Sequence, residues 1–262
     1  MAGFEEVLSN VPLKMKQFIP GYRYLKRFYS DSIFNKVDQD KAIRKLHNIH
    51  KGDRCFILGS GPSLNKTNLS LLANEIVFGC NTIYKLPIIH SKYYGVCDII
   101  VWKKRYKKLL DLDTILFLSG SAARDYISHR DYYSKFQKKE PFLLRDLGEM
   151  NYYKRMSKDL TKGVYWGHTV IIDICIQVSY YLGFDKVYLL GCDSNYSLGG
   201  RFDGKPTDNL KGGGALGSWD EVFNAYNICK HAFEEDGREI VNATIGGKLE
   251  VFERKSLEEI LI

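Results

Sequence analysis

The chain has 262 residues, of which 45% are hydrophobic and 26% charged, so a sizeable core is expected and extensive disorder is not. Lysines and arginines exceed aspartates and glutamates by 38 − 31 = 7, which points to an anionic partner. No run of about 18 apolar residues predicts a transmembrane helix, and no apolar segment near the N-terminus predicts a secretory signal. The six cysteines form no C-x-x-C pair and are expected to be buried free thiols of a cytoplasmic protein.

Residues 1–50 have helical character and many cations, and the run 22–29 alternates aromatic rings with lysine and arginine. We expect a basic helical N-terminal arm at 1–50, followed by one main domain at 51–262. Two roles for the arm remain open. It could pack on the main domain, with lysine stems covering apolar surface, or lie on the inner face of the cell membrane as an amphipathic helix.

From residue 51 onward, short apolar runs typical of buried strands alternate with helical segments. The alternation predicts an α/β fold: a Rossmann-like, mostly parallel sheet flanked by helices. Ligands of such sheets bind beyond the carboxyl ends of the strands, where this chain carries small and polar residues. We expect strands at 54–59, 75–80, 94–101, 114–118, 142–144, 186–191, 239–241 and 249–252, and helices at 64–74, 167–182, 219–235 and the C-terminus.

A glycine-rich turn follows the first predicted strand. Its backbone amides could approach an anion where the next helix begins. The turn lacks the third glycine of the dinucleotide fingerprint and the Gly-Lys-Ser/Thr ending of a P-loop, so a nucleotide-binding turn and a plain strand–helix turn both remain open. The turn consists of Gly59, Ser60, Gly61, Pro62 and Ser63.

Further polar residues lie after the second strand and before the long helix. Asn81 could contact a ribose or a base, or form an Asx turn of its own. Thr161, Lys162 and Gly163 form a second anion-binding candidate, in which Lys162 would neutralise a phosphate. His168 is either a general acid or base, or an ordinary residue of the first helical turn.

The segment after the strand at 186–191 carries the third candidate group. Asp193 could accept a hydrogen bond from a sugar hydroxyl, bind a cation or cap backbone amides, and Tyr196 could hydrogen-bond a leaving phosphate. One carboxylate with one amide is a poor Mg²⁺ site unless a diphosphate completes the shell. No motif indicates a protein-bound zinc ion, a serine nucleophile or RNA binding, so neither a metal nor nucleic acid is expected.

Taken in order, these blocks resemble a known superfamily. Gly-x-Gly-Pro-Ser-Leu at 59–64, Cys80-Asn81, Thr-x-Gly-Val-Tyr at 161–165 and the run 182–193 are similar to bacterial sialyltransferases of the Campylobacter lipo-oligosaccharide type. They are equally similar to the motility-accessory-factor and pterin-diphosphokinase-like family, to which the run 242–249 looks closer. The resemblance covers about residues 52–255.

The sialyltransferase resemblance implies a metal-independent enzyme that binds a CMP-activated sugar at 59–63, Asn81 and 161–163, with Tyr196 stabilising the departing phosphate. The chain departs from that family in three places. The family's asparagine in the glycine turn is Ser60, and its arginine falls at Asp159. Its expected catalytic histidine aligns near 217–218, where no histidine lies, so His168 or Asp193 would have to serve as the base.

Three functions are compatible with these features. The leading hypothesis is a sialyltransferase-like glycosyltransferase that moves a sugar from a nucleotide-linked donor to a surface-polysaccharide or lipo-oligosaccharide acceptor, with no cofactor and with His168, Asp193 and Tyr196 as catalytic residues. The second is an ATP-dependent diphosphokinase of the hydroxymethylpterin type, with Mg²⁺ bound by Asp193 and Asp203. The third is a non-catalytic nucleotide-binding protein at the membrane face. Homo-oligomer formation is open in all three.

Overall fold

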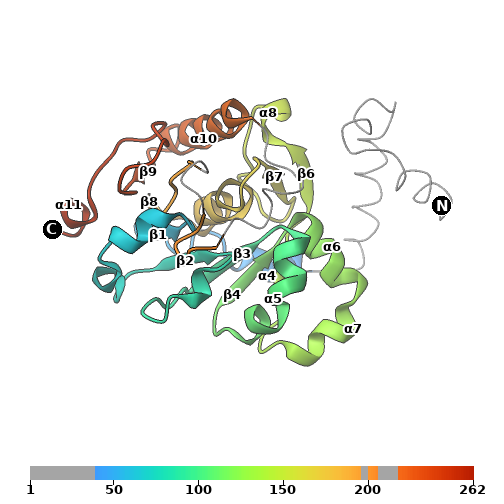
Figure 1. The fold of residues 1–262 in the computed structure, drawn as a ribbon. Coiled ribbons are helices and arrows are strands. Elements are labelled where there is room, and N and C mark those ends of the chain that lie inside the picture. Colours follow the sequence, from blue (N-terminus) through green and yellow to red (C-terminus); the bar gives the residue numbers. More distant parts are fainter. Residues whose placement is uncertain (1–38, 196–199, 206–217) are drawn as a thin grey trace. The chain divides into compact units, whose positions relative to one another are not determined.

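The computed structural model describes residues 39–195, 200–205 and 218–262, which belong to one compact unit running from Gln39 to Ile262 (Figure 1). Its centre is a seven-stranded sheet with the order β5-β4-β3-β2-β1-β8-β9, in which all neighbouring strands are parallel. The predicted α/β, Rossmann-like fold is thereby confirmed. The strands are β1 (Arg54–Leu58), β2 (Val77–Cys80), β3 (Tyr93–Val96), β4 (Ile115–Leu118), β5 (Phe142–Leu143), β8 (Lys186–Leu190) and β9 (Glu239–Asn242).

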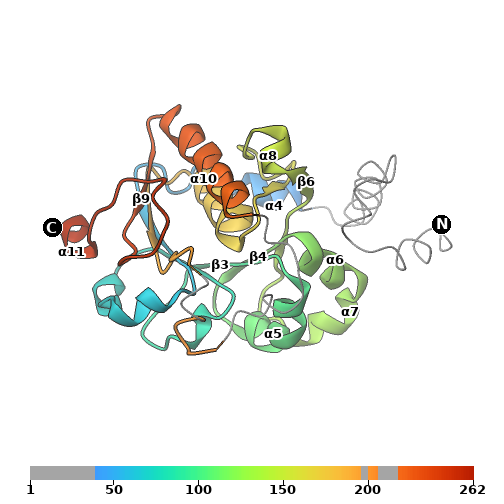
Figure 2. The ribbon, with the colours of Figure 1, turned by 45° about the horizontal axis from the view of Figure 1, so that its top comes forward.

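Helices cover both faces of this sheet, with α8 and α10 on one side and α5, α6 and α7 on the other (Figures 1 and 2). A second parallel sheet of two strands, β6 (Asp146–Glu149) and β7 (Val164–Trp166), lies between the fifth and eighth strands of the chain and was not expected from the sequence. The α-helices are α4 (Asp40–Arg44), α5 (Ile99–Asp111), α6 (Gly120–Ser128), α7 (Arg130–Tyr133), α8 (Met150–Tyr153), α9 (Gln177–Leu182), α10 (Trp219–Glu234) and α11 (Leu257–Leu261).

The predicted long helix consists of a π-helical segment, η5 (Ile171–Ile176), that continues directly into α9. Every residue from 171 to 182 is buried, because the helix lies between the sheet and α10 and is apolar nearly all round. It packs closely over β3 at Gly95, where a Cβ atom would lie 3.0 Å from Ile174 Cγ2. The helix begins at Val170, three residues later than predicted.

Three local predictions are wrong. Residues 64–74 form two short 3₁₀ helices, Pro62–Lys66 and Leu69–Leu72, because the extended backbone at Thr67 separates them. The strand expected at 94–101 ends at Val96. Asp98 then accepts hydrogen bonds from two following backbone amides, at 2.6 and 3.1 Å, and starts α5. The run 249–252 forms bends and no strand.

The part of the expected arm that the structure describes, residues 39–50, bonds to the end of α9. Asn48 N donates to Tyr181 O at 3.0 Å, and His50 N donates to Leu182 O at 2.8 Å. Residues 1–38 lie outside the described part of the chain. Among the described residues, no helix combines the length and the apolar character that crossing a membrane requires.

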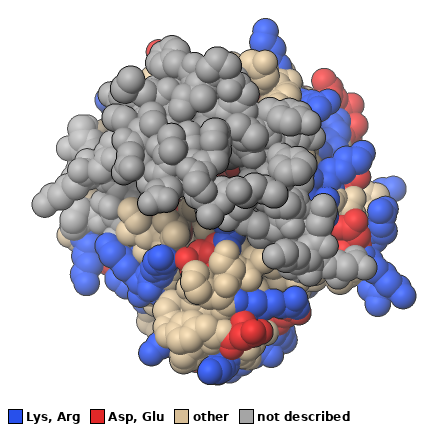
Figure 3. All heavy atoms as spheres, turned by 90° about the vertical axis from the view of Figure 1, so that its right-hand side faces the viewer, with Lys and Arg blue, Asp and Glu red and all other residues tan. Residues whose placement is uncertain are grey.

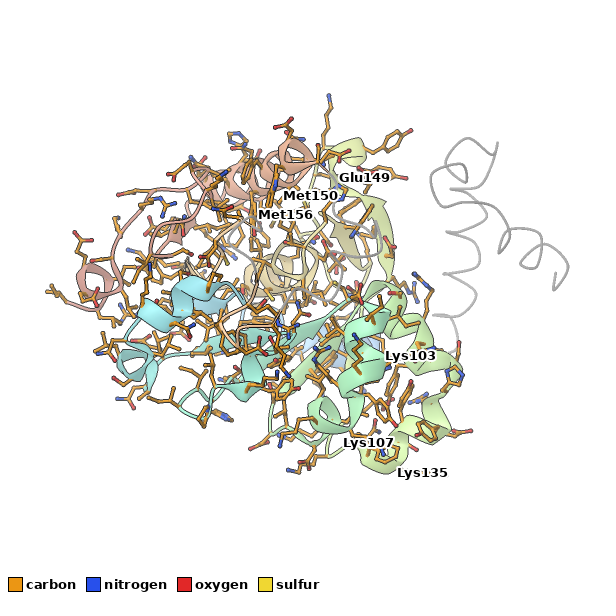
Figure 4. All side chains as sticks on the ribbon, viewed as in Figure 1. Lys103, Lys107, Lys135, Glu149, Met150 and Met156 are labelled. Atoms are coloured by element: carbon orange, nitrogen blue, oxygen red, sulfur yellow. The ribbon has the colours of Figure 1, made fainter. Side chains whose placement is uncertain are left out.

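Two lysines of α5 have local partners. Lys103 Nζ lies 3.5 Å from Asp125 Oδ1, and Lys107 Nζ lies 5.2 Å from the ring centroid of Phe136 (Figure 4). Acidic and basic side chains lie side by side in the described part of the face drawn in Figure 3. The positive net charge is therefore not gathered into one basic region on that part of the surface.

Candidate functional site

The carboxyl ends of β1 and β8 lie side by side in the sheet, at the point where the strand order changes direction. This topological switch point is where open α/β sheets bind ligands. Gly59 N donates to Leu190 O at 2.8 Å, and Gly61 N donates to Gly191 O at 2.9 Å. A Cβ at Gly59 would lie 2.5 Å from Gly191 O, so the close approach of the two turns requires glycine.

Asp193 is hydrogen-bonded to the glycine turn itself. Ser63 Oγ donates to Asp193 Oδ2 at 2.7 Å, and Ser63 N donates to Asp193 Oδ1 at 3.2 Å. A Cβ at Gly61 would lie only 1.8 Å from Asp193 Oδ2. Of the roles considered for Asp193, this geometry corresponds to the capping of a backbone amide, and the residue is 7% exposed.

Asn81 follows β2 at the same edge of the sheet. Its backbone has a left-handed φ of 50°, which is uncommon for a residue other than glycine. Its Oδ1 atom and the neighbouring Thr82 Oγ1 are buried without a hydrogen-bond partner in the part of the chain that the structure describes. A buried polar atom left unpaired costs about 1–3 kcal/mol, so a ligand hydroxyl or N–H group would stabilise this position.

The segment 200–205 lies against the glycine turn. Phe202 N donates to Ser60 O at 3.0 Å, and Asn65 Nδ2 donates to Phe202 O at 2.9 Å. Two backbone-directed hydrogen bonds therefore hold this segment beside the predicted phosphate site, with Arg201 and Asp203 on either side of Phe202.

Two cations share one carboxylate in this segment. Asp203 Oδ1 lies 3.1 Å from Arg201 Nε, and Asp203 Oδ2 lies 2.5 Å from Lys85 Nζ. Burial raises the pKa of Asp203, but the hydrogen bonds from Arg201 and Lys85 outweigh burial and hold that pKa well below its usual range. The Arg201 side chain is 6% exposed and that of Lys85 is 31% exposed, so a buried guanidinium and a partly exposed ammonium group lie beside the turn.

A second group of ionisable side chains lies at the ends of β6, β7 and the start of α10. His168 Nε2 is 3.6 Å from Glu149 Oε1, and ligand atoms of Glu149, His168 and Glu221 lie within 4.8 Å of one another. The Trp166 ring packs on the imidazole with centroids 4.3 Å apart. Among the described residues, these three side chains are the group that could hold a metal ion, and Figure 4 shows Glu149 beside α8.

His168 lies on the same edge of the main sheet as the glycine turn. Gly167 N donates to Asp173 Oδ1 at 2.7 Å, and Asp173 interacts with Cys97, the first residue after β3. Burial raises the pKa of Asp173 well above its usual range. Because the helix η5–α9 therefore begins at the carboxyl end of β3, His168 is placed where a ligand of the sheet would lie.

The loop 161–163 lies elsewhere. Thr161 N and Oγ1 donate to Asp159 Oδ1 at 3.0 and 2.7 Å, and Lys162 Nζ is 3.5 Å from Asp159 Oδ2 with its side chain 76% exposed. Burial and the Asp159 carboxylate raise the pKa of Tyr181, near the C-terminal end of α9. Gly163 packs against Arg145 O with φ of 120°. The structure thus brings Asn81 and Asp193 to the glycine turn and does not bring this loop there.

Several residues of this edge were missed from the sequence, and Tyr196 lies outside the described residues. Lys85 and Arg201 carry no local pattern that distinguishes them from other surface cations. In the sequence, Glu221 is recognisable as the last residue of a Ser-x-x-Glu capping box. That motif predicts the start of a helix and does not predict a ligand-binding residue. The proximity of Glu149 to His168 could not be predicted, because it depends on the pairing of β6 with β7.

A parallel sheet with glycine turns and polar side chains at its switch point defines a Rossmann-like protein with a candidate ligand site at the carboxyl ends of its strands. The family model described as 6-hydroxymethylpterin diphosphokinase MptE-like matches residues 31–199. The chain belongs to this MptE-like family, and the match includes β1, β2, β8 and Asp193.

Among solved structures, the chain is similar to the sialyltransferase CstII from Campylobacter jejuni, described in complex with the substrate analogue cytidine-5'-monophosphate. The two are 16% identical with a TM-score of 0.48, over 78% of this chain and 85% of that one. No curated protein matches the chain. The family match confirms the pterin-diphosphokinase-like part of the superfamily resemblance.

Proposed function

We propose that the chain is a glycosyltransferase that takes a sugar from a nucleotide-linked donor and holds the donor phosphate at the switch point without Mg²⁺. The observation that carries this proposal is the pair of cations beside the glycine turn, where Lys85 and Arg201 both contact the carboxylate of Asp203. A phosphate that develops charge as it leaves is stabilised by such fixed cations. Asp193 and Asp203, the two acids that Mg²⁺ would need there, are instead bonded to Ser63 and to the two cations.

The other predicted residues take the following roles. The buried Oδ1 of Asn81 would accept a hydrogen bond from the donor's ribose or base, and Tyr196 would donate to the departing phosphate. Asp193 is committed to Ser63, so the proposal places activation of the acceptor hydroxyl at His168 and its neighbour Glu149. The acceptor would be a surface polysaccharide or a lipo-oligosaccharide, reached in the cytoplasm or at the inner face of the membrane.

A second candidate is favoured by the family match, whose description names a 6-hydroxymethylpterin diphosphokinase. Such an enzyme would move diphosphate from ATP to a hydroxymethyl acceptor with Mg²⁺. Asp193 and Asp203 would then have to leave Ser63 and Lys85 and turn toward the ion. The two candidates therefore differ in what these carboxylates do when nucleotide binds.

A thermal-shift panel separates the candidates. CMP, CDP, UDP, GDP and ATP are each tested in EDTA and in Mg²⁺, and a nucleotide at about 100 times its Kd adds about 2.7 kcal/mol of stability. We expect CMP to raise Tm in EDTA, whereas a shift seen only with ATP and Mg²⁺ would support the diphosphokinase.

Two variants separate binding from chemistry. Asn81→Ala should abolish the rise in Tm that CMP causes. Tyr196→Phe should keep the shift and slow sugar transfer, and binding without any turnover would leave only the non-catalytic role.

A further inference from the structure

We infer that Glu149, His168 and Glu221 bind a divalent transition-metal ion of the Zn²⁺ or Mn²⁺ class. The ligand set consists of one imidazole nitrogen and two carboxylates. Imidazole suits zinc and other transition metals, whereas Mg²⁺ is bound by oxygen ligands and retains its waters. Catalytic zinc sites have three protein ligands and one open coordination position. The cluster likewise offers three side chains.

The distances suit neighbouring ligands of one ion. The 3.6 Å between His168 Nε2 and Glu149 Oε1 exceeds a normal hydrogen-bond length. Two ligands on a tetrahedral ion with bonds of about 2.0–2.1 Å lie roughly 3.4 Å apart. The two carboxylates also bring like charges within 4.8 Å of each other, an arrangement that a cation stabilises.

Packed elements hold the three side chains in place. Glu149 ends β6 and is followed directly by α8, while Glu221 lies in the first turn of α10. Asn151 Nδ2 donates to Glu221 O at 2.9 Å, and Asn224 Nδ2 donates to Asn151 Oδ1 at 2.9 Å, so α8 and α10 are fixed to each other beside the cluster. Such support keeps metal ligands oriented.

Among the described residues of the cluster, the most exposed is Glu221. The His168 side chain is 4% exposed and that of Glu149 is 29% exposed, while Glu221 lies on the surface. Glu221 Oε2 accepts from Ser218 N at 2.6 Å, and its carboxylate has a second oxygen for a metal. An ion would therefore enter from the Glu221 side and keep coordination positions that face solvent.

The role of the ion rests on the proposed function. A divalent ion lowers the pKa of a bound hydroxyl, and here it would supply the activation for which the expected histidine near 217–218 is missing. The acceptor hydroxyl loses its proton to water, and its oxygen forms a bond to the anomeric carbon of the donor sugar. The bond from that carbon to the donor phosphate breaks, and the nucleotide leaves with the electron pair beside Lys85 and Arg201. His168 and Glu149 would thus activate the hydroxyl through the ion that they hold.

The test is a metal titration of the full chain without an affinity tag, after removal of metals with EDTA. Zn²⁺ is titrated by calorimetry, and Co²⁺ is used as a visible-spectrum probe. We expect one equivalent of Zn²⁺ to bind, and Glu149→Gln and Glu221→Gln each to weaken binding by at least about tenfold. The Co²⁺ spectrum should show no thiolate band, which excludes the six cysteines as ligands.

The helix α10 offers a matched control. His231 Nδ1 lies 3.6 Å from Glu234 Oε2 on its surface, the same separation as in the cluster. In the described part of the chain this pair is not among the groups of three with metal-ligating geometry. Glu234→Gln should therefore leave Zn²⁺ binding unchanged. Glu221→Gln keeps an amide oxygen that can serve in the capping box, so its unfolding temperature in EDTA should stay close to that of the wild type.

Two results would overturn the inference: no Zn²⁺ binding at millimolar metal, or Zn²⁺ binding that both glutamine variants leave intact. Neither result affects the CMP shift in EDTA, which tests the nucleotide site alone. A chain that binds CMP in EDTA but no Zn²⁺ retains the proposed function and loses the metal site. A chain that binds Zn²⁺ through these residues but no nucleotide has the metal site and lacks the proposed function.

Discussion

The Asp193 carboxylate accepts hydrogen bonds from both the hydroxyl and the backbone amide of Ser63. Asp193 and Ser63 are 130 positions apart in the sequence. The contact joins the turn after β1 to the turn after β8 at the switch point of the sheet. Asp193 therefore positions the glycine turn before any ligand arrives. A residue in this position affects stability and ligand binding together, and the two effects can be separated by mutation.

Asp193→Ala should lower the free energy of unfolding by about 1–3 kcal/mol, because it leaves two buried donors of Ser63 without their acceptor. Ser63→Ala removes one donor and should cost less, and the double variant should cost less than the sum of the two. Urea unfolding measures all three. Asp111→Asn, which breaks the exposed pair with Lys138, is the control and should change stability by about 0–1 kcal/mol. Equal losses for Asp193→Ala and Asp111→Asn would contradict the assignment.

Gly61→Ala should be poorly tolerated, because its Cβ would lie 1.8 Å from Asp193 Oδ2 and 2.6 Å from Gly191 O. Overpacking of this kind costs about 1–3 kcal/mol or more. Adding Asp193→Ala removes the nearest clash, so the double variant should recover part of the stability that Gly61→Ala loses. Gly204→Ala is the comparison, since nothing lies within 4 Å of its Cβ position and only the φ of 69° is unfavourable. Thermal unfolding of Gly61→Ala, Asp193→Ala, the double variant and Gly204→Ala tests this, and strictly additive losses of stability in the double variant would argue against a direct clash.

Lys162→Ala should leave CMP affinity unchanged, because the loop 161–163 lies near Tyr181 and away from the glycine turn. Lys85→Ala should weaken CMP binding about tenfold, since Lys85 is one of the two cations beside the turn. The two lysines form a matched pair for one calorimetric titration in EDTA. A tenfold loss with Lys162→Ala would restore the sequence-based placement of the phosphate.

The main sheet and its glycine turn could be predicted because each is determined by the types of residue that are adjacent in the sequence. Buried strands such as 54–58 read as continuous apolar runs, and the run Gly59-Ser-Gly61 directly marks a turn. The first turn of α5 was misread as the end of a strand at 94–101, because Ile99, Ile100 and Val101 favour a strand on propensity alone. The Asp98 cap that starts the helix acts through two backbone amides, which the apolar pattern does not show.

The candidate site was harder to predict because its charges are paired across the fold. Lys85 and Asp203 are 118 positions apart, and the strand β6 that carries Glu149 is recognisable only beside β7. The resemblance to sialyltransferases placed the loop 161–163 in the site. In the structure, residues 167–169 lie at the carboxyl end of β3 instead, because β7 separates the loop from the helix that follows. Local pattern therefore identified the edge of the sheet, and only tertiary contacts identified its charges.

Asp203→Asn should raise CMP affinity in EDTA several-fold, because it removes the carboxylate that competes with a phosphate for Lys85 and Arg201. If Asp203 is instead a Mg²⁺ ligand, the same variant should weaken binding of ATP with Mg²⁺. The sign of the change thus distinguishes the two candidate functions. Asp113→Asn, at an exposed pair with Lys139, is the control and should change neither affinity.

Asp203 should also contribute to the pH dependence of stability. Its pKa is lowered in the folded chain, where hydrogen bonds from Arg201 and Lys85 outweigh the opposing effect of burial. The contribution is therefore fully present above the ordinary carboxyl pKa of about 3.9 and is lost as pH falls through the lowered folded value. The free energy of unfolding of wild type and Asp203→Asn should differ most near pH 7 and converge below about pH 4. A difference that stays constant from pH 7 to pH 3 in urea titrations would show that the carboxylate is not held by these cations.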